Sequence, residues 1–280
     1  MPKDLVVVPS EPPPPYTDNP HPSAPHAHDT SPAGTPGARR PPPGRPPPLN
    51  MPCLNTLRRE RVVLASASPR RRQLLAQIGL THMDIVPSHF AEDLSHSLGA
   101  LNYVLETASA KAQDVYRREI DHAHKADLAL VIAADTIIVA HSGRILEKPR
   151  GEADHVAMLK MLRDDGQHKV MTAIAVMRPN ESGAHPGYRM ETHVEETTVW
   201  FDGSVSDDLI RSYVRTRDGN DKAGGYGIQT AGSILIEKIE GSYDNVVGLP
   251  LRATLKLIEK VMLPEEDEAA GGMFVESDEE

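Results

Sequence analysis

Cysteine is nearly absent from this sequence of 280 residues, because Cys53 is the only one. A single thiol excludes an intrachain disulfide and a multi-thiolate metal site, which fits a reducing compartment. The sequence also lacks any apolar run close to the ~20 residues that a membrane-spanning helix needs. Its short N-terminal apolar patch at residues 5–8 is followed by prolines, so it makes a poor signal peptide. We therefore expect a cytoplasmic protein with no membrane partner.

An excess of basic residues is absent as well, since the formal net charge is −10. Eight acidic residues and no basic residue lie between positions 265 and 280, so most of the negative charge belongs to the C-terminal end. The first 57 residues carry four acids and four bases, which leaves the central part nearly neutral. A neutral central part gives no support for a nucleic-acid partner.

Proline is concentrated at one end, with 18 of the 25 prolines among the first 52 residues. Such a segment has too little apolar periodicity to offset the entropy of ordering it. We therefore predict a disordered proline-rich tail at 1–57, one folded domain at 58–263 and a disordered acidic tail at 264–280. The proline runs could dock a proline-recognising partner, but a plain tail is the more common interpretation of this composition.

Strand and helix patterns alternate through the central part. Apolar runs predict strands at 62–65, 84–86, 128–140, 145–147, 169–177, 192–201 and 233–239. Helical spacing predicts helices at 69–78, 101–120, 152–163, 207–214 and 250–261. The alternation, with a hairpin in the middle, indicates the α/β class with a mixed sheet flanked by helices.

The first chemically informative stretch is LASASPRRR, residues 64–72, which joins a predicted strand to a predicted helix. Ser68 suits the N-cap and Pro69 the first helical position, where a missing N–H costs nothing. The free N–H groups of Arg70 and Arg71 and their guanidinium groups would then suit a phosphate. The alternative is that these arginines are ordinary solvated helix residues, which is our interpretation of Arg72.

The second stretch places Asp135 directly after an apolar run at 128–134. A buried carboxylate needs a partner, so Asp135 could be a metal ligand or a general base, or it could cap a local turn. The hairpin that follows returns Glu147 and Lys148 toward it, and Glu92 is a further candidate ligand. Carboxylate oxygens are the ligands that Mg²⁺ or Mn²⁺ would use together with phosphates.

The third stretch is a glycine-rich segment at 221–251 in which Tyr226 and Gln229 are interspersed. A phenol and an amide suit the polar edge of a nucleobase, although a wide turn before a strand would look similar. Lys111 lies on the long predicted helix, where spacing alone indicates only a solvated lysine.

Taken together, LASASPRR, AADTIIVAHSGRILEKP and DKAGGYGIQ with IEGSYDNVVGLPL resemble the signatures of the Maf family of nucleotide pyrophosphatases, in order and spacing. The resemblance runs from about residue 62 to 261. It implies the twisted α/β architecture shared with inosine-triphosphate pyrophosphatases, and dimerisation. The implied activity is hydrolysis of a nucleoside triphosphate between its α- and β-phosphates.

The same resemblance implies roles for single residues. Asp135 corresponds to the proton acceptor, and Arg70, Thr136 and Gln229 correspond to positions linked with substrate specificity. The motifs are similar to the branch that acts on dTTP and UTP. The sequence departs from the usual pattern at two positions, where Gly225 replaces an alanine and Thr230 replaces a glycine.

We therefore expect a pyrophosphatase that converts dTTP or UTP to the monophosphate and pyrophosphate. The residues expected to hold the triphosphate are Ser68, Arg70, Arg71, Lys111 and Lys148. Asp135, Glu147 and Glu92 are expected to hold a divalent ion or to activate water. Thr136, Tyr226 and Gln229 are expected to line the base pocket. The alternatives are a non-catalytic nucleotide-binding regulator of division or septation, and a nucleotidyltransferase that uses the same phosphate cradle.

Overall fold

The computed structural model describes residues 47–121, 125–180 and 187–263. The predicted acidic tail and most of the predicted proline-rich tail lie outside this part. None of the helices in these three ranges is both long and apolar enough to cross a bilayer.

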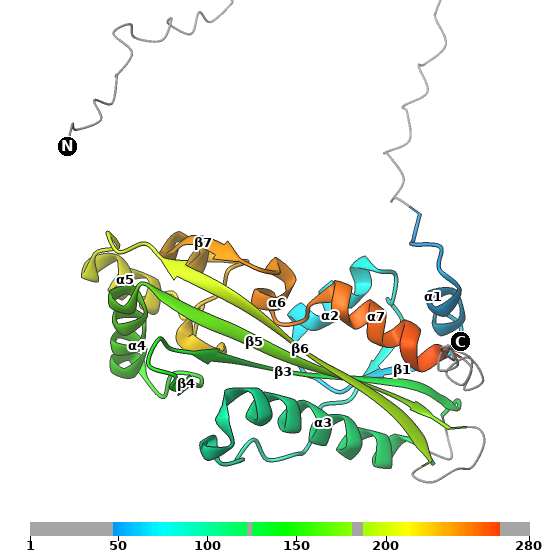
Figure 1. The fold of residues 1–280 in the computed structure, drawn as a ribbon. Helices are drawn as coiled ribbons and strands as arrows, with labels where there is room; N and C mark the ends of the chain where they lie inside the picture. The colour runs from blue at the N-terminus through cyan, green and yellow to red at the C-terminus, as the bar shows by residue number, and fades with distance from the viewer. Residues whose placement is uncertain (1–46, 122–124, 181–186, 264–280) are drawn as a thin grey trace, which may run out of the picture. The chain divides into compact units, whose positions relative to one another are not determined.

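The described part is built on one twisted sheet of seven strands (Figure 1). The strands are β1 (Arg61–Leu64), β2 (Met83–Ile85), β3 (Leu128–Val139), β4 (Ile145–Leu146), β5 (Gln167–Pro179), β6 (Tyr188–Phe201) and β7 (Ile236–Glu240). Their order is β2-β1-β3-β5-β6-β7, and β4 pairs with β3 outside this path. β1 is parallel to β2 and β3, whereas the remaining pairs are antiparallel. The predicted α/β class with a mixed sheet is confirmed.

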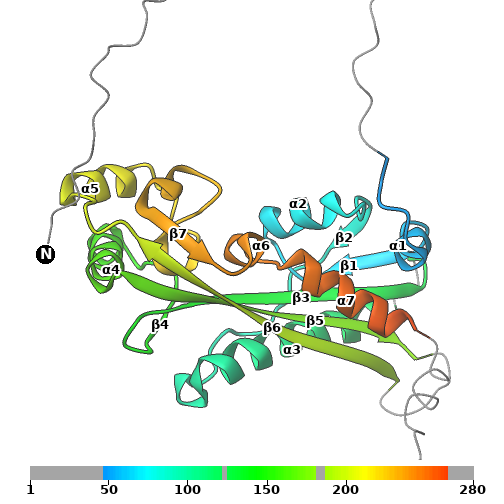
Figure 2. The ribbon, with the colours of Figure 1, turned by 45° about the horizontal axis from the view of Figure 1, so that its top comes forward.

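Helices cover both faces of this sheet. They are α1 (Pro52–Leu57), α2 (Pro69–Gln77), α3 (Gly99–Glu119), α4 (Glu152–Asp165), α5 (Asp207–Arg215), α6 (Tyr243–Val247) and α7 (Leu251–Met262). The long α3 lies alone on one face, and α2, α6 and α7 lie on the other (Figures 1 and 2). α4 and α5 pack together at one end.

Alternating side chains of β3 explain why this strand reads as one apolar run. Leu130 and Ile132 belong to the core shared with α1, α2 and α7, whereas Val131 and Ala133 belong to the core shared with α3. Successive strand residues point to opposite faces, so a strand covered on both faces is apolar at every position. The same alternation sends Asp135 toward the α3 face and the next residue toward the α2 face.

The edge of β3 is only partly occupied by other strands. β1 ends opposite Ile132, and β4 begins to pair at Ile138. Among the described residues, no strand pairs with this edge between the two positions. Asp135 and Thr136 lie within the open interval, and a loop after β1 approaches it.

The sequence pattern did not predict two short elements near the C-terminal end. The strand predicted from residue 233 begins at Ile236, because residues 231–235 form a tight 3₁₀ turn in which the backbone of Gly232 packs on Gly227. Helix α6 has five residues, too few to establish a helical period. By contrast, the helix predicted at 207–214 is confirmed, and Ser206 caps it, since its Oγ accepts from the N–H of Leu209 at 3.2 Å.

The predicted start of the folded domain at residue 58 is wrong. Pro52 opens α1, and Leu54 and Leu57 are at most 1% exposed in the core that also holds Ile258 of α7. The proline content of the preceding segment concealed this helix, although proline is favourable in a first helical turn.

Leu54→Ala should therefore lower the free energy of unfolding by about 2–5 kcal/mol, because it removes a fully buried side chain and leaves a cavity. Urea denaturation measures the change. Leu49→Ala is the matched control, since that side chain is about half exposed. Equal effects of the two substitutions would contradict the placement of α1 in the core.

Candidate active site

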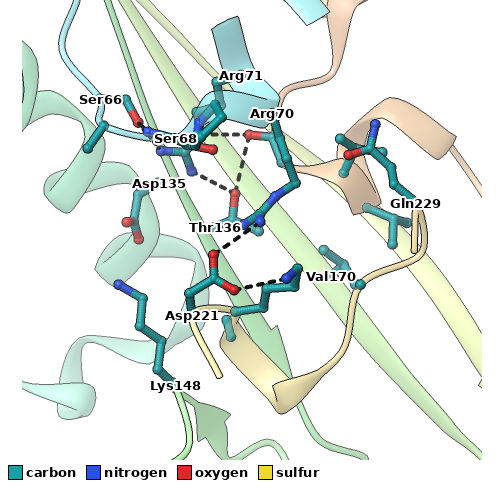
Figure 3. Close-up of a pocket in the computed structure, with 18 of the residues that line it drawn as sticks. Ser66, Ser68, Arg70, Arg71, Asp135, Thr136, Lys148, Val170, Asp221 and Gln229 are labelled. Atoms are coloured by element: carbon teal, nitrogen blue, oxygen red, sulfur yellow. Dashed lines mark hydrogen bonds and ion pairs between the residues drawn. The ribbon is translucent and has the colours of Figure 1, made fainter. Parts of the chain in front are cut away.

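A cavity of about 790 Å³ lies beside the open interval of β3. It is lined by residues from all three sequence stretches, and Figure 3 shows their convergence. Ten of the predicted site residues line it: Ser68, Arg70, Arg71, Glu92, Lys111, Asp135, Thr136, Lys148, Tyr226 and Gln229. Glu147 does not. The cavity exists because β1 stops short and leaves the middle of β3 accessible.

The loop between β1 and α2 forms one wall of the cavity. The backbone N–H of Ser68 donates to Ser66 Oγ at 3.2 Å, and Ser68 occupies the N-cap of α2 without a side-chain capping bond. The N–H groups of Arg70 and Arg71 make no hydrogen bond within the described residues, as expected in a first helical turn. These donors and the positive end of the helix dipole make the wall suitable for an anion.

The guanidinium of Arg71 is engaged in hydrogen bonds within the protein. Its guanidinium donates to the carbonyl oxygen of Gly248 at 2.9 Å, to Ser66 Oγ at 3.0 Å and to Thr136 Oγ1 at 3.0 Å. Burial lowers the pKa of Arg71, and the nearby charge of Asp135 opposes that shift. Arg71 therefore joins the loop, β3 and the segment before α7 into one rigid wall.

Arg70 is the more available arginine. The only hydrogen bond or ion pair of its side chain within the described residues is a 3.4 Å contact with Asp221, and both side chains are partly exposed to solvent. A long pair of this kind contributes little stability, so its guanidinium can turn to another anion. The exposed Arg72 does not line the cavity, in agreement with its interpretation as a solvated residue.

Lys111 bridges the two carboxylates of the cavity. Its Nζ lies 2.7 Å from Asp135 Oδ1 and 2.7 Å from Glu92 Oε1. Asp135 and Lys111 are both buried, so each charge compensates the other. The ammonium comes from α3, onto whose face Asp135 points. Asp135 stands inside β3 and pairs with Ala173, so the alternative of a local turn cap is wrong.

The acidity of Glu92 reflects this bridge. Burial alone would raise the pKa of Glu92, but the hydrogen bond and charge of Lys111 outweigh it and hold that pKa below its usual value. The carboxylate therefore stays ionised at neutral pH. Spacing along the helix had indicated only a solvated lysine, because position 111 cannot reveal what faces it across the sheet.

The donor set is compatible with a hard divalent cation. Asp135 and Glu92 offer carboxylate oxygens, and within the described residues no group of three acidic, histidine or cysteine side chains forms a complete metal site. Mg²⁺ is commonly held by one or two carboxylates and completes its shell with water and phosphate oxygens. These two residues fit that pattern, with the phosphates supplied by a ligand.

The side chains of Glu147 and Lys148, at the end of the hairpin, point in different directions. Lys148 lines the cavity and extends toward Asp135 (Figure 3). Glu147 is exposed, and its Oε1 lies 3.3 Å from Nε2 of His96. Adjacent residues point in different directions, so the catalytic role predicted for Glu147 gains no support from its position.

The glycine-rich segment closes the other side. Tyr226 is buried, and its hydroxyl lies 2.6 Å from Nε2 of His168, so this hydroxyl is directed to the protein rather than to a ligand. Gln229 is exposed and makes no hydrogen bond within the described residues. Thr230 donates to Asp218 Oδ2 at 2.5 Å, which directs its hydroxyl to the protein. The replacement of a glycine by Thr230 thus adds a fixed contact.

The cavity residues that were not predicted from the sequence include Ser66, Asp221 and Lys222. Ser66 lies within the first motif, where it organises the backbone. Asp221 and Lys222 begin the glycine-rich motif and pair with each other at 2.9 Å. Their position beside Arg70 depends on the folding of two segments about 150 residues apart.

Comparison with known proteins identifies the family of this chain. Residues 61–261 match the family described as Maf-like protein. A dTTP/UTP pyrophosphatase of Schizosaccharomyces pombe is 46% identical over 209 residues, which cover 74% of this chain and 86% of that protein. One of Acetivibrio thermocellus is 44% identical, covering 68% of this chain and 90% of that protein. A human protein described as a probable bifunctional dTTP/UTP pyrophosphatase/methyltransferase is 39% identical, covering 75% of this chain and 34% of that protein.

Lys111→Met should raise the pKa of Glu92, because burial remains while the main compensating charge is lost. A carboxylate with a lowered pKa in the folded state stabilises the fold above its unfolded pKa and loses that contribution as the pH falls through the folded value. The bridge therefore stabilises the protein at neutral pH and not in strong acid.

Carbon-13 NMR titration of the Glu92 carboxyl measures this change. Glu119 is an internal control, because its lowered pKa depends on Lys125 and Arg61 instead. An unchanged Glu92 titration in the variant would rule out the bridge.

Proposed function

The chain belongs to the Maf family, and we propose that its cavity hydrolyses the α–β phosphoanhydride bond of a nucleoside triphosphate. The protein is a nucleoside triphosphate pyrophosphatase of the dTTP/UTP type. The observation that carries the assignment to this cavity is the pair of carboxylates, bridged by Lys111, beside a cationic helix N-terminus. Nothing in the comparisons favours the non-catalytic regulator.

The triphosphate lies along the cationic side of the cavity. The α2 N-terminus offers free N–H groups, and Arg70, Lys148 and Lys222 supply positive charge from three separate segments. Arg71 holds this wall in place. Five cationic and three anionic side chains line the cavity, so their sum favours a polyanion. The same charges stabilise the pyrophosphate that leaves.

The base lies on the glycine-rich side. Gln229 presents a free amide, and Ile228 and Val247 provide apolar surface. An amide can both donate to and accept from the imide edge shared by uracil and thymine. Thr136 stands deeper, where its hydroxyl contacts Arg71, so its influence on specificity would pass through that wall.

Asp135 is the general base for the attacking water. Its Oδ1 is held by Lys111, and no hydrogen bond to Oδ2 occurs within the described residues. Lys111 orients the carboxylate that accepts the proton. A divalent ion, Mg²⁺ or Mn²⁺, held by Asp135 and Glu92 would withdraw charge from the phosphate oxygens.

Three further expectations remain proposals: a cytoplasmic location, a homodimer, and a docking role for the proline-rich tail.

Pyrophosphate release across a nucleotide panel tests the function. We expect release from dTTP and UTP in the presence of Mg²⁺ or Mn²⁺ and its loss after chelation. A panel without release would overturn the proposal, and release that survives chelation would exclude the ion. Exchange of labelled pyrophosphate into substrate would instead indicate a nucleotidyltransferase.

Asp135→Asn should lower kcat by about 10²–10⁴-fold while KM changes little, because the amide keeps the shape and loses the base. Steady-state kinetics with dTTP measure both constants. Asp127→Asn, an exposed site before β3, is the matched control. Wild-type kcat in the Asp135 variant would exclude the general-base role.

Arg70→Ala should raise KM for dTTP by about tenfold, the scale of one charge-assisted hydrogen bond. Arg72→Ala changes the same residue type two positions further along α2 but outside the cavity, so its KM should match the wild type. If both variants gave the same KM, the phosphate role of Arg70 would fail.

A further inference from the structure

Two buried histidines contact the glycine-rich loop, which is the part of the glycine-rich segment at residues 224–232. His155 on α4 and His168 on β5 are each 1% exposed. Nε2 of His155 lies 2.5 Å from the carbonyl oxygen of Gly225. A carbonyl can only accept, so His155 donates this bond from its Nε2–H and leaves Nδ1 as its other polar atom. That Nδ1 has no partner within the described residues.

His168 holds the next residue of the loop. Its Nε2 lies 2.6 Å from the hydroxyl of Tyr226, and both rings pack edge-to-face with Phe201. Burial lowers the pKa of His168 to about 3, so the ring is neutral at physiological pH. A neutral imidazole and a phenol bring two donors to one contact, and the described residues offer no second acceptor. One buried donor therefore remains unsatisfied, which is costly for a purely structural pair.

The ring of His155 is closely packed against two glycines. Gly225 has a φ of +76°, and a Cβ there would lie 2.6 Å from Cδ2 of His155. A Cβ on Gly219 would lie 2.8 Å from Nε2 of the same ring. The imidazole fits only because both neighbours are glycines, which gives a physical reason for glycine rather than alanine at position 225.

We propose that His155 and His168 are positioning residues for recognition of the base: they fix Gly225 and Tyr226, and thereby the segment that presents Ile228 and Gln229 to the nucleotide. The proposal rests on the proposed function. Neither histidine lines the cavity, and the carboxylate machinery comes from α3, β3 and the loop before α3. Loosening the glycine-rich loop should therefore affect binding of the base more than the chemical step.

His168→Leu tests this inference. We expect KM for UTP to rise about five- to tenfold, the scale of one lost hydrogen bond, while kcat stays within about twofold. His168→Gln should restore most of the loss, because its amide nitrogen can reach the Tyr226 hydroxyl. His155→Leu provides a second, independent test of the same loop, because it removes the donor to the carbonyl of Gly225, and we expect a rise in KM of the same size.

Leu57→Ala is the control for a merely structural role. It opens a cavity in the core beneath α1, remote from the loop, and should lower Tm with an unchanged KM. A wild-type KM in folded His168→Leu, or an equal rise in the Leu57 variant, would overturn the inference.

Calorimetric titration with a non-hydrolysable UTP analogue repeats the comparison as Kd. Wild-type protein that binds the analogue but releases no pyrophosphate would refute the proposed function alone. A weaker Kd in His168→Leu would then still support the positioning role, and an unchanged Kd would refute it.

Discussion

The site depends on an interruption along one edge of the sheet. β1 stops opposite Ile132 and β4 pairs with β3 only from Ile138 onward, so the middle of β3 has no neighbouring strand on that side within the described residues. Strand alternation then turns Asp135 toward α3 and Thr136 toward α2. A cavity beside this interval can therefore be lined by side chains from both faces of the sheet. The surrounding loop supplies the helix end that such an opening needs to bind an anion.

A carboxylate within a buried strand requires compensation, and Lys111 provides it. Both charges are removed from water, which costs several kcal/mol per ion unless the pair is close and well bonded. The same ammonium also reaches Glu92, so one cation organises two acidic groups. The stabilising interaction and the chemical one are thus the same contact, which makes the site sensitive to any change at α3.

The cations of the cavity divide into fixed and available groups. Arg71 is fully engaged by Ser66, Thr136 and Gly248, whereas Arg70 keeps only a long ion pair. Fixed groups set the shape of the wall, and available groups can follow the charge of a bound phosphate chain. The buried histidines likewise set the shape of the glycine-rich loop, a segment with few large side chains of its own.

The sequence by itself determined the α/β class and the strand bounds within a few residues, because apolar periodicity and helix-start residues act locally. Ten of the cavity residues were also expected from it, some of them, such as Thr136, only through the resemblance to a known family. Only the tertiary structure decided which side chains meet. It buried α1 behind a proline-rich segment, turned Lys111 from an ordinary helix lysine into the partner of Asp135, and directed Glu147 away from its neighbour Lys148. These outcomes depend on contacts between segments far apart in the chain, and local patterns carry no record of them.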